Sequence, residues 1–247
     1  MIQTFPSTLV TKQEIAPSVY LLTFQLDKNA PELIFKAGQY LILKVPKDGT
    51  FVSRLFSIAS AAVSSRRFEL IVKFEPYGIA STYLEALSIG ETVAFQGPAG
   101  FFTIKNPQQN KIFLITGTGI APVRSMLLEP KQSLDPKTQN YLFWGVPTYK
   151  DLYLVEEFVK LEQDYPNFHL YFCLSRESTL HHIPSELHQK IVIGRATQGF
   201  EDKLLATNYQ LIDTDFYLCG NRDVVEFLRE YTHEKGVEKE RIIFEKF

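Results

Sequence analysis

The chain of 247 residues contains only two cysteines, two methionines and one tryptophan. With Cys173 and Cys219 alone, the sequence has neither a disulfide scaffold nor enough thiolates for an iron–sulfur cluster. No apolar run approaches the roughly twenty residues of a membrane-spanning helix, and the first residues lack the basic start and apolar stretch of a secretion signal. We therefore expect no membrane span and a cytoplasmic location.

A strong net charge is also absent. The 26 basic and 28 acidic side chains give a formal net charge of −2, which argues against a nucleic-acid-binding protein. The five histidines show no spacing typical of a metal site. Neither a G-x-S-x-G elbow nor a G-x-x-x-x-G-K-[ST] loop occurs. The sequence thus gives no support to a metalloenzyme, a hydrolase or a nucleoside triphosphatase.

The pattern of the sequence changes near residue 107. Before it, short segments rich in β-branched and aromatic residues alternate with turn sequences, which is typical of a small antiparallel barrel. After it, uninterrupted apolar runs alternate with amphipathic helical stretches, which is typical of a parallel sheet covered on both faces. We predict a β-barrel domain over residues 1–106 and an α/β domain over residues 107–247.

The individual elements follow from the same patterns. The predicted strands of the first domain are residues 18–26, 39–45, 54–60, 67–74 and 91–97, with one short helix at about residues 80–86. The predicted strands of the second domain are residues 112–116, 141–145, 169–175 and 215–220, with helices from Val123 and near residues 151–163.

Two glycines, Gly117 and Gly119 in "ITGTGIAP", follow the first strand of the second domain. Glycines at the carboxyl end of a parallel strand let the backbone approach phosphates, and the helix start that follows supplies free N–H groups. Pro122 suits the first turn of that helix but stands where the G-x-G-x-x-G fingerprint has its third glycine. A phosphate site and a tight structural turn are both compatible with this segment.

Two further strand ends carry candidate residues. "CGN" places Cys219, Gly220 and Asn221 at a second carboxyl end, so we expect it to face the same crevice as the glycines. The alternative is a buried cysteine before a helix start. In "SRE", Ser175 and Arg176 suit the 2′-phosphate of NADPH, and the alternative is a surface arginine.

Arg195 in "GRAT" would add a second cation to that 2′-phosphate site.

In the first domain, "RLFSIAS" begins with Arg54, which belongs either to an ordinary barrel surface or to a strand that holds an anionic, planar ligand. "KFEPYGIAS" places Gly78 and Ser81 at a helix start, with Lys73 in the preceding strand. This start is either an anion site or a serine-capped turn.

In order along the chain, "RLFSIAS", "GIAS", "GPAGFF", "GTGIAP", "SRE" and "CGN" resemble the motifs of the ferredoxin–NADP⁺ reductase family. The similarity extends over nearly the whole chain. It implies a six-stranded antiparallel β-barrel that binds FAD, followed by a five-stranded parallel sheet, with helices on both faces, that binds NAD(P)H.

The resemblance also implies roles for individual residues. Arg54 matches the arginine that holds the flavin pyrophosphate, Phe56 the aromatic ring that stacks on the isoalloxazine, and Ser57 the serine near flavin N5. The residues that match phosphate-binding segments are Gly78, Ile79, Ala80 and Ser81 for FAD, and Gly117, Thr118 and Gly119 for the nicotinamide dinucleotide.

Three residues are expected near the reacting rings besides those of the barrel. Cys219 matches the cysteine that lies against the nicotinamide. Glu245 and Phe247 lie where many members of the family place a carboxylate and an aromatic ring over the flavin. By this resemblance, Ser57, Cys219 and Glu245 form the expected catalytic set.

The function implied is hydride transfer between NADPH, or NADH, and bound FAD, with electrons exchanged with ferredoxin, flavodoxin or a similar small carrier. Two departures from the family pattern keep alternatives open. Phe56 replaces the usual tyrosine, as in many reductases that use free flavin as a substrate. Pro147 stands where many NADP-using members carry an arginine, which keeps NADH open as an alternative to NADPH. Lys150 could replace the missing cation. The third alternative is a non-catalytic electron-transfer subunit of the same fold.

Overall fold

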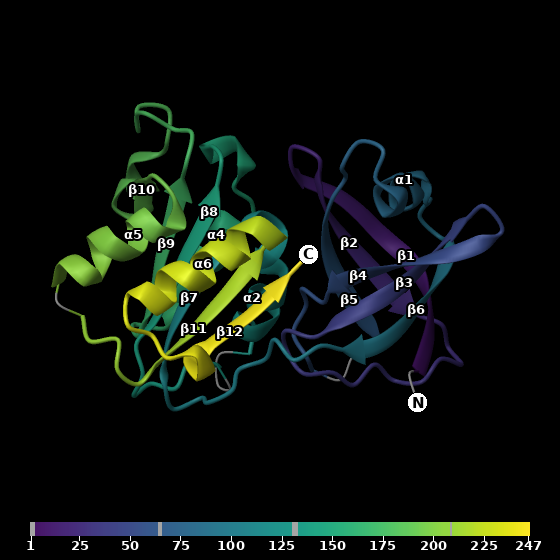
Figure 1. The fold of residues 1–247 in the computed structure, drawn as a ribbon. Coiled ribbons are helices and arrows are strands. Elements are labelled where there is room, and N and C mark those ends of the chain that lie inside the picture. Colours follow the sequence, from purple (N-terminus) through teal and green to yellow (C-terminus); the bar gives the residue numbers. More distant parts are fainter. Residues whose placement is uncertain (1–2, 64–65, 130–132, 208) are drawn as a thin grey trace. The chain divides into compact units, whose positions relative to one another are not determined.

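A computed structural model describes residues 3–63, 66–129, 133–207 and 209–247 (Figure 1). The chain forms two compact units. The first comprises Met1–Ile104 together with Ala121–Pro130, and the second comprises Lys105–Ile120 together with Lys131–Phe247. Each unit contains one sheet and is described by itself.

The first unit is an antiparallel barrel with the strand order β4-β3-β6-β1-β2-β5. The two edge strands meet where Ile58 pairs with Leu70 and the Ala59 N–H donates to the Glu69 carbonyl, which closes the sheet. The strands are β1 (Gln3–Ala16), β2 (Val19–Leu26), β3 (Tyr40–Lys47), β4 (Thr50–Ser57), β5 (Arg67–Lys73) and β6 (Thr92–Ala99).

The interior of the barrel is filled by alternate residues of these strands, as the period-two side-chain pattern requires. Phe24, Phe68 and Phe95 pack there with ring centroids 5.0–5.4 Å apart, two pairs edge-to-face and one stacked. The helix α1 (Ile79–Ala86) lies outside the strands, as Figure 1 shows, and turns Leu84 toward the core. The barrel is therefore held together by a largely aromatic core.

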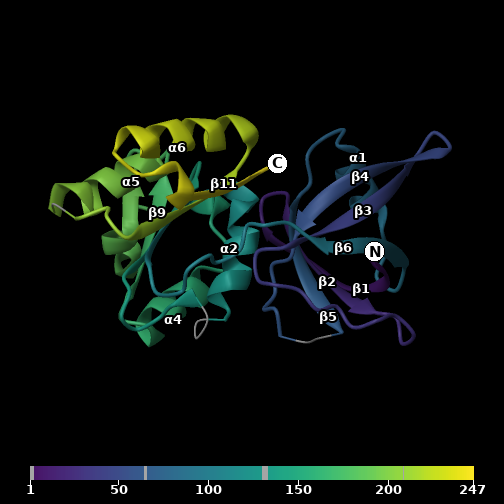
Figure 2. The same ribbon diagram turned by 60° about the horizontal axis from the view of Figure 1, so that its bottom comes forward.

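The second unit is a parallel sheet with the order β10-β9-β8-β7-β11-β12. Its strands are β7 (Asn110–Thr116), β8 (Asn140–Val146), β9 (Phe168–Leu174), β10 (Ile191–Ile193), β11 (Thr214–Gly220) and β12 (Ile242–Lys246). The helices described along the same stretch are α2 (Ile120–Leu127), α4 (Val155–Asp164), α5 (Ala196–Lys203) and α6 (Arg222–Glu234). In Figure 2, α5 and α6 cover one face of this sheet and α4 the other.

The predicted fold class, a β-barrel followed by a parallel α/β sheet, is confirmed. The second sheet has six strands rather than the five that the resemblance implied. The sixth, β12, is the chain's last strand and pairs with β11 from Phe216↔Ile242 to Gly220↔Lys246. The strand β1 was not predicted either, and α2 begins at Ile120 rather than Val123.

The residues of helix α2 belong to both units: Ile120 groups with the second unit, and the rest of the helix groups with the first. From Ala121 onward it groups with the barrel, although residues 107–247 were predicted to form the second domain. The Arg124 Nη1 explains part of this grouping, because it donates to the Ala59 carbonyl at 2.8 Å and to the Glu69 carboxylate at 2.7 Å. The Arg124 side chain is only 8% exposed, so this ion pair is largely shielded from water.

The start of the second sheet contains a buried lysine. The Lys111 Nζ donates to the carbonyls of Pro107 at 2.9 Å and Gln109 at 2.7 Å. Burial lowers the pKa of this ammonium to about 8, although Asp215 and Asp135 oppose the shift. Lys111 thus ties the connecting segment to the first strand of the second unit.

Candidate functional site

The second sheet reverses its strand order beside β7, because the chain adds β8, β9 and β10 on one side and then β11 and β12 on the other. In parallel sheets, ligands bind outside the carboxyl ends of the strands at such a switch point. β7 and β11 are the two strands that meet there. Gly117–Gly119 follows β7, and Cys219–Asn221 comprises the last two residues of β11 and the residue after it. The fold therefore brings these two predicted segments together.

Two glycines allow the strand ends to approach closely. A Cβ on Gly119 would lie 2.6 Å from the Cys219 carbonyl oxygen, and a Cβ on Gly220 would lie 2.1 Å from the Thr116 Oγ1. Real Cβ contacts of this length essentially never occur, so neither position accepts a side chain without a shift. The glycines at this crevice are thus required by packing across the sheet, and Thr116 is a site residue that the motifs did not identify.

Gly117 has a different role. Its φ is +53°, in the left-handed region that glycine adopts at least cost, and nothing lies within 4 Å of its missing Cβ. Its carbonyl accepts hydrogen bonds from the Trp144 Nε1 at 3.0 Å and the Tyr153 hydroxyl at 3.3 Å. The turn Gly117–Gly119 has no side-chain cap and no acidic residue in its first turn. Its open side is thus available to an anionic group.

Cys219 is fully buried at the end of β11. Burial, and then the nearby Glu245 carboxylate, raise the pKa of its thiol, so the thiol is neutral at physiological pH. Glu245 lies opposite Cys219 in the β11–β12 register. Burial and the raised pKa of the thiol favour a packing role for Cys219 over that of a thiolate nucleophile.

The other predicted residues at the end of this sheet are exposed or engaged. Phe247 is exposed, and its backbone N–H donates to the Gly220 carbonyl at 3.3 Å. Asn221 caps α6, because its side-chain oxygen accepts from the Val224 N–H at 2.9 Å. Pro122 lies in the first turn of α2, where its missing N–H costs nothing.

Ser175 and Arg176 lie directly after β9, and Arg195 follows the adjacent strand β10. The Gly194 N–H donates to the Leu174 carbonyl, which ties the two strand ends together. All three side chains point out at exposed positions. The sheet thus places both predicted cations at neighbouring strand ends.

Glu177 is a residue of this region that the motifs did not single out. Its carboxylate accepts from the Tyr149 N–H at 3.0 Å and contacts the His182 Nε2 at 3.1 Å. The hydrogen bond from Tyr149 is the main reason why the pKa of this carboxyl lies below its usual value. The carboxylate therefore fastens the turn after β9 to the turn that follows β8.

In the barrel, the three residues of the R-x-F-S pattern lie at the end of the edge strand β4. Arg54 is exposed, and within the described part of the chain its side chain contacts only the Ser53 carbonyl, at 2.9 Å. Phe56 is half-buried and packs against the barrel core, and Ser57 is also half-buried. Arg54 and Phe56 alternate with Leu55 and therefore lie on the same face of the strand.

The "GIAS" segment forms the start of α1. Gly78 is the N-cap residue, and the first turn has neither a side-chain cap nor an acidic residue. The N–H groups of Ile79, Ala80 and Ser81 therefore lack intrahelical acceptors. The Ser81 Oγ is engaged within the turn, because it accepts from the Glu75 N–H at 2.9 Å.

Lys73, the remaining predicted residue of the barrel, pairs with the Glu75 carboxylate at 2.6 Å. Both side chains are about half exposed, so this pair is open to water. The predicted anion site thus has free backbone donors, whereas its serine and lysine already have partners.

Comparison with known protein families assigns one domain family to each of the two parts of the chain. Residues 6–104 match the family described as oxidoreductase FAD-binding domain, and residues 113–230 match the oxidoreductase NAD-binding domain. The chain belongs to the ferredoxin–NADP⁺ reductase family. The predicted FAD and nicotinamide-dinucleotide cofactors are thus confirmed at the level of the two binding domains.

Three similar proteins illustrate the range of this reductase family. The phenol hydroxylase P5 protein of Acinetobacter pittii is 35% identical over 171 residues, which are 68% of this chain and 46% of that protein. The structure of the Amycolatopsis cytochrome P450 reductase GcoB has a TM-score of 0.83 and 25% identity, and the match covers 100% of this chain and 70% of that one.

The third is a ferredoxin NADP⁺ reductase from Neisseria gonorrhoeae, solved with bound FAD and NADP. It has a TM-score of 0.77 and 20% identity, and the match covers 99% of this chain and 98% of that one. This likeness shows the shared fold. By contrast, the chain spans about half the length of the phenol hydroxylase protein.

The residues of this reductase-family chain fit FAD. Free N–H groups at the start of α1 and the exposed guanidinium of Arg54 are the donors that a pyrophosphate takes. A Cβ on Gly78 would approach the Ser81 Oγ to 2.9 Å and the Glu75 carbonyl to 3.1 Å, so a side chain there requires these two groups to shift by a few tenths of an ångström. The donor set and the tight backbone together match an anion-binding helix start.

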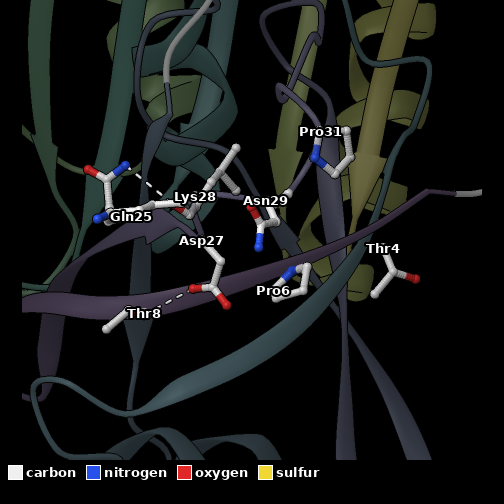
Figure 3. Close-up of a pocket in the computed structure, with 10 residues that line it drawn as sticks. Thr4, Pro6, Thr8, Gln25, Asp27, Lys28, Asn29 and Pro31 are labelled. Atoms are coloured by element: carbon white, nitrogen blue, oxygen red, sulfur yellow. Dashed lines mark hydrogen bonds between the residues drawn. The ribbon is translucent and has the colours of Figure 1, made fainter.

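A hollow elsewhere on the barrel involves none of these residues. This space measures about 700 Å³. Figure 3 shows Thr8 and Asp27 beside it, where the Thr8 hydroxyl donates to the Asp27 carboxylate at 3.2 Å. Its lining residues are Thr4, Pro6, Thr8, Gln25, Leu26, Asp27, Lys28, Asn29, Ala30 and Pro31.

No group of three or more His, Cys, Asp or Glu side chains in residues 3–63, 66–129, 133–207 and 209–247 is arranged to hold a metal ion. Over the same ranges, no helix has both the length and the apolar character that crossing a bilayer requires.

Proposed function

We propose that this protein transfers hydride between NADPH and bound FAD and exchanges electrons with ferredoxin, flavodoxin or a similar small carrier. The observation that carries the proposal is the switch point of the second sheet. There, Gly119 and Gly220 bring two backbone segments together and leave an uncapped turn open to an anion. The same chain carries an uncapped helix start and an exposed Arg54 for FAD.

Bound FAD accepts hydride from a nicotinamide and releases electrons singly, which suits a one-electron carrier. The residues of this chain bind and orient. Arg54 and the first amides of α1 would hold the pyrophosphate, the ring of Phe56 would offer a flat apolar surface to the flavin, and Ser57 would supply a hydroxyl beside it. Cys219, neutral and buried, would lie against the nicotinamide, with Glu245 opposite it in the β11–β12 register.

A reductase that serves a partner protein is the type that the relatives favour. The phenol hydroxylase P5 protein and the P450 reductase are named for oxygenase systems, and the Neisseria enzyme is named for ferredoxin. For this chain we propose a small carrier protein such as ferredoxin or flavodoxin as the electron partner.

NADPH is the preferred dinucleotide in this proposal. Arg176 and Arg195 extend from adjacent strand ends, and two guanidinium groups suit a 2′-phosphate better than a 2′-hydroxyl. Lys150 lies exposed in the turn after β8. Replacing both arginines with alanine is expected to raise the KM for NADPH at least tenfold and to leave the KM for NADH within about twofold.

A reductase that uses free flavin is the second candidate, and Phe56 favours it. Phenylalanine keeps the stacking surface and lacks the hydroxyl with which a tyrosine binds the flavin side chain. Such an enzyme needs few contacts to the adenosine half, whereas the start of α1 and Arg54 both offer donors to the pyrophosphate. The two candidates therefore differ in whether FAD stays bound.

The visible absorption spectrum of the purified, desalted protein separates them. A flavin spectrum near one FAD per chain supports the carrier reductase. A colourless protein that oxidises NADPH only when flavin is added supports the flavin reductase. A protein that is both colourless and inactive leaves the non-catalytic subunit and overturns the proposal.

An arginine variant tests the pyrophosphate site. Arg54→Ala removes the guanidinium from an exposed edge strand, so it should release FAD on desalting without loss of folding. Lys47→Ala, which removes an exposed cation from the adjacent strand β3, is the matched control and should retain FAD.

A further inference from the structure

The Gly117 carbonyl accepts hydrogen bonds from two side chains outside its own turn. The Trp144 Nε1 donates to it at 3.0 Å and the Tyr153 hydroxyl at 3.3 Å. Both rings are buried and pack edge-to-face with their centroids 4.8 Å apart. The turn itself is already closed by the Ile120 N–H, which donates to the same carbonyl. The two side-chain donors therefore serve another purpose than closing the turn.

The surroundings of Tyr153 explain why its hydroxyl donates to this carbonyl. Burial raises the pKa of the hydroxyl, so the hydroxyl stays protonated at physiological pH. A buried hydroxyl that lacks an acceptor destabilises the folded chain, and the Gly117 carbonyl supplies the acceptor. This hydrogen bond thus satisfies the hydroxyl and fixes the carbonyl at the same time.

The segment that carries Tyr153 is itself fixed. At its start, the N–H and the hydroxyl of Thr148 donate to the Asp151 carboxylate at 2.8 Å and 2.7 Å. At its end, Leu154 has a φ of +51°, in the left-handed region where a leucine is strained. Strained residues persist where the surrounding structure over-determines them. The segment therefore presents the Tyr153 hydroxyl at a defined position.

Holding the Gly117 carbonyl also directs the N–H group that follows it. The peptide between Gly117 and Thr118 is trans, and the C=O and N–H of a trans peptide point in opposite directions. With the carbonyl turned toward Trp144 and Tyr153, the Thr118 N–H points away from both rings. A carbonyl that accepts hydrogen bonds also polarises its peptide, which makes that N–H a stronger donor. The two rings therefore set the direction and the strength of one backbone donor in the turn.

We propose that Tyr153 is a positioning residue for the dinucleotide, because its hydroxyl holds the Gly117 carbonyl so that the Thr118 N–H faces the pyrophosphate of NADPH. The inference rests on the proposed function, which assigns this uncapped turn to the dinucleotide phosphates. Trp144 makes the same kind of hydrogen bond, but its ring also packs against two phenylalanines of the core. Tyr153 is thus the partner whose hydrogen bond can be removed with less effect on packing.

Tyr153→Phe provides the test, because it removes the hydroxyl and keeps the ring. The full chain, loaded with FAD, is titrated with NADP⁺ and separately with adenosine 2′-phosphate, which lacks the pyrophosphate. The Kd for NADP⁺ is expected to rise about three- to tenfold, the range of one hydrogen bond, and the Kd for adenosine 2′-phosphate to change less than about twofold. In turnover with ferricyanide as the electron acceptor, the KM for NADPH should rise by a similar factor while kcat stays within about twofold.

Tyr217→Phe is the matched control that separates positioning from folding. The Tyr217 hydroxyl is also buried in the second unit and bound to the backbone, because it accepts from the Lys105 N–H at 2.9 Å. Its removal leaves that N–H without this acceptor, so Tyr217→Phe should lower the Tm at least as much as Tyr153→Phe. The Kd for NADP⁺ should nevertheless equal that of the wild type.

Other results would overturn the inference. Equal losses of affinity for NADP⁺ and adenosine 2′-phosphate would show that Tyr153 shapes the whole binding edge. An unchanged Kd for NADP⁺ would leave Tyr153 a purely structural residue, and an equal loss in Tyr217→Phe would trace the effect to stability. A wild type that binds neither ligand refutes the proposed function together with the inference. A wild type that binds NAD⁺ instead refutes only the preference for NADPH, and NAD⁺ and adenosine then replace the two ligands in the same comparison.

Discussion

The close approach of Gly119 to β11 leads to a quantitative prediction. In Gly119→Ala, the new Cβ would lie 2.6 Å from the Cys219 carbonyl oxygen and 2.7 Å from its carbon. Both are backbone atoms, so no side chain can rotate away. Restoring ordinary contact at 3.4 Å requires a separation of about 0.8 Å between the turn and β11. Strand β11 is hydrogen-bonded on both sides, to β7 and β12, and resists such a shift.

Overpacking of this kind typically costs about 1–3 kcal/mol, and the absence of a flexible neighbour places Gly119→Ala near about 3 kcal/mol. For a protein of this length, that loss corresponds to a fall in Tm of roughly 6–12 °C. The same shift opens the crevice at the switch point, so the affinity for NADP⁺ should fall more than tenfold.

Gly117→Ala is the matched control, because Gly117 lies in the same turn and has no atom within 4 Å of its missing Cβ. Its φ of +53° makes an alanine strained by about 1 kcal/mol, so Tm should fall by roughly 2–4 °C. Thermal unfolding followed by circular dichroism, together with NADP⁺ titration, measures both variants. A Gly119→Ala protein that melts within a degree of the wild type would refute the packing argument. Equal losses in the two variants would show that backbone strain is the dominant cost.

Three more predictions concern buried groups. Arg124→Met should lower the free energy of unfolding, measured by thermal unfolding, by about 2–4 kcal/mol, because it removes the ion-pair partner of the partly shielded Glu69 carboxylate. The double variant with Glu69→Gln should recover part of this loss. The pKa of Lys111 is about 8 in the folded chain and about 10.4 when unfolded, so the unfolded chain binds more protons between these values. The free energy of unfolding in urea, taken as the wild type minus Lys111→Met, should therefore rise by about 2 kcal/mol from pH 8 to pH 10. A difference that does not change with pH would contradict the buried ammonium. Cys173 and Cys219 are fully buried with raised pKa values, so a thiol reagent should label neither in the folded protein and both after denaturation; rapid labelling of the native chain would show that the end of β11 is open.

Local patterns in the sequence identified most strands. The strand β2 alternates buried and half-buried residues, and β7 and β11 are continuous apolar runs, so each was recognised from its own composition. The strand β1 escaped recognition although it is the longest of the barrel. Ser7 stands at the inward position between Phe5 and Leu9, where its hydroxyl donates to the Phe5 carbonyl, and Pro6 beside it is uncommon in strands.

The candidate site was partly visible in the sequence as well. A strand followed by glycines, and another followed by "CGN", are local signals, and a parallel sheet places their carboxyl ends on one edge. The roles of Arg54, Phe56 and Ser57 came from the resemblance to a family, because a cation and an aromatic on a strand specify no ligand by themselves. Those roles, and that of Glu245, stay predictions that flavin binding will test.

The sequence by itself determined the order of the elements, the change from barrel to α/β sheet and the positions of the glycine turns. Only the tertiary structure decided which glycines are needed for packing, since Gly119 meets Cys219 and Gly220 meets Thr116 across strands that are about a hundred residues apart in sequence. It also showed that β12 completes the second sheet and that Arg124 binds Glu69. Periodicity and turn chemistry act over a few residues, whereas these contacts depend on how distant segments are brought together.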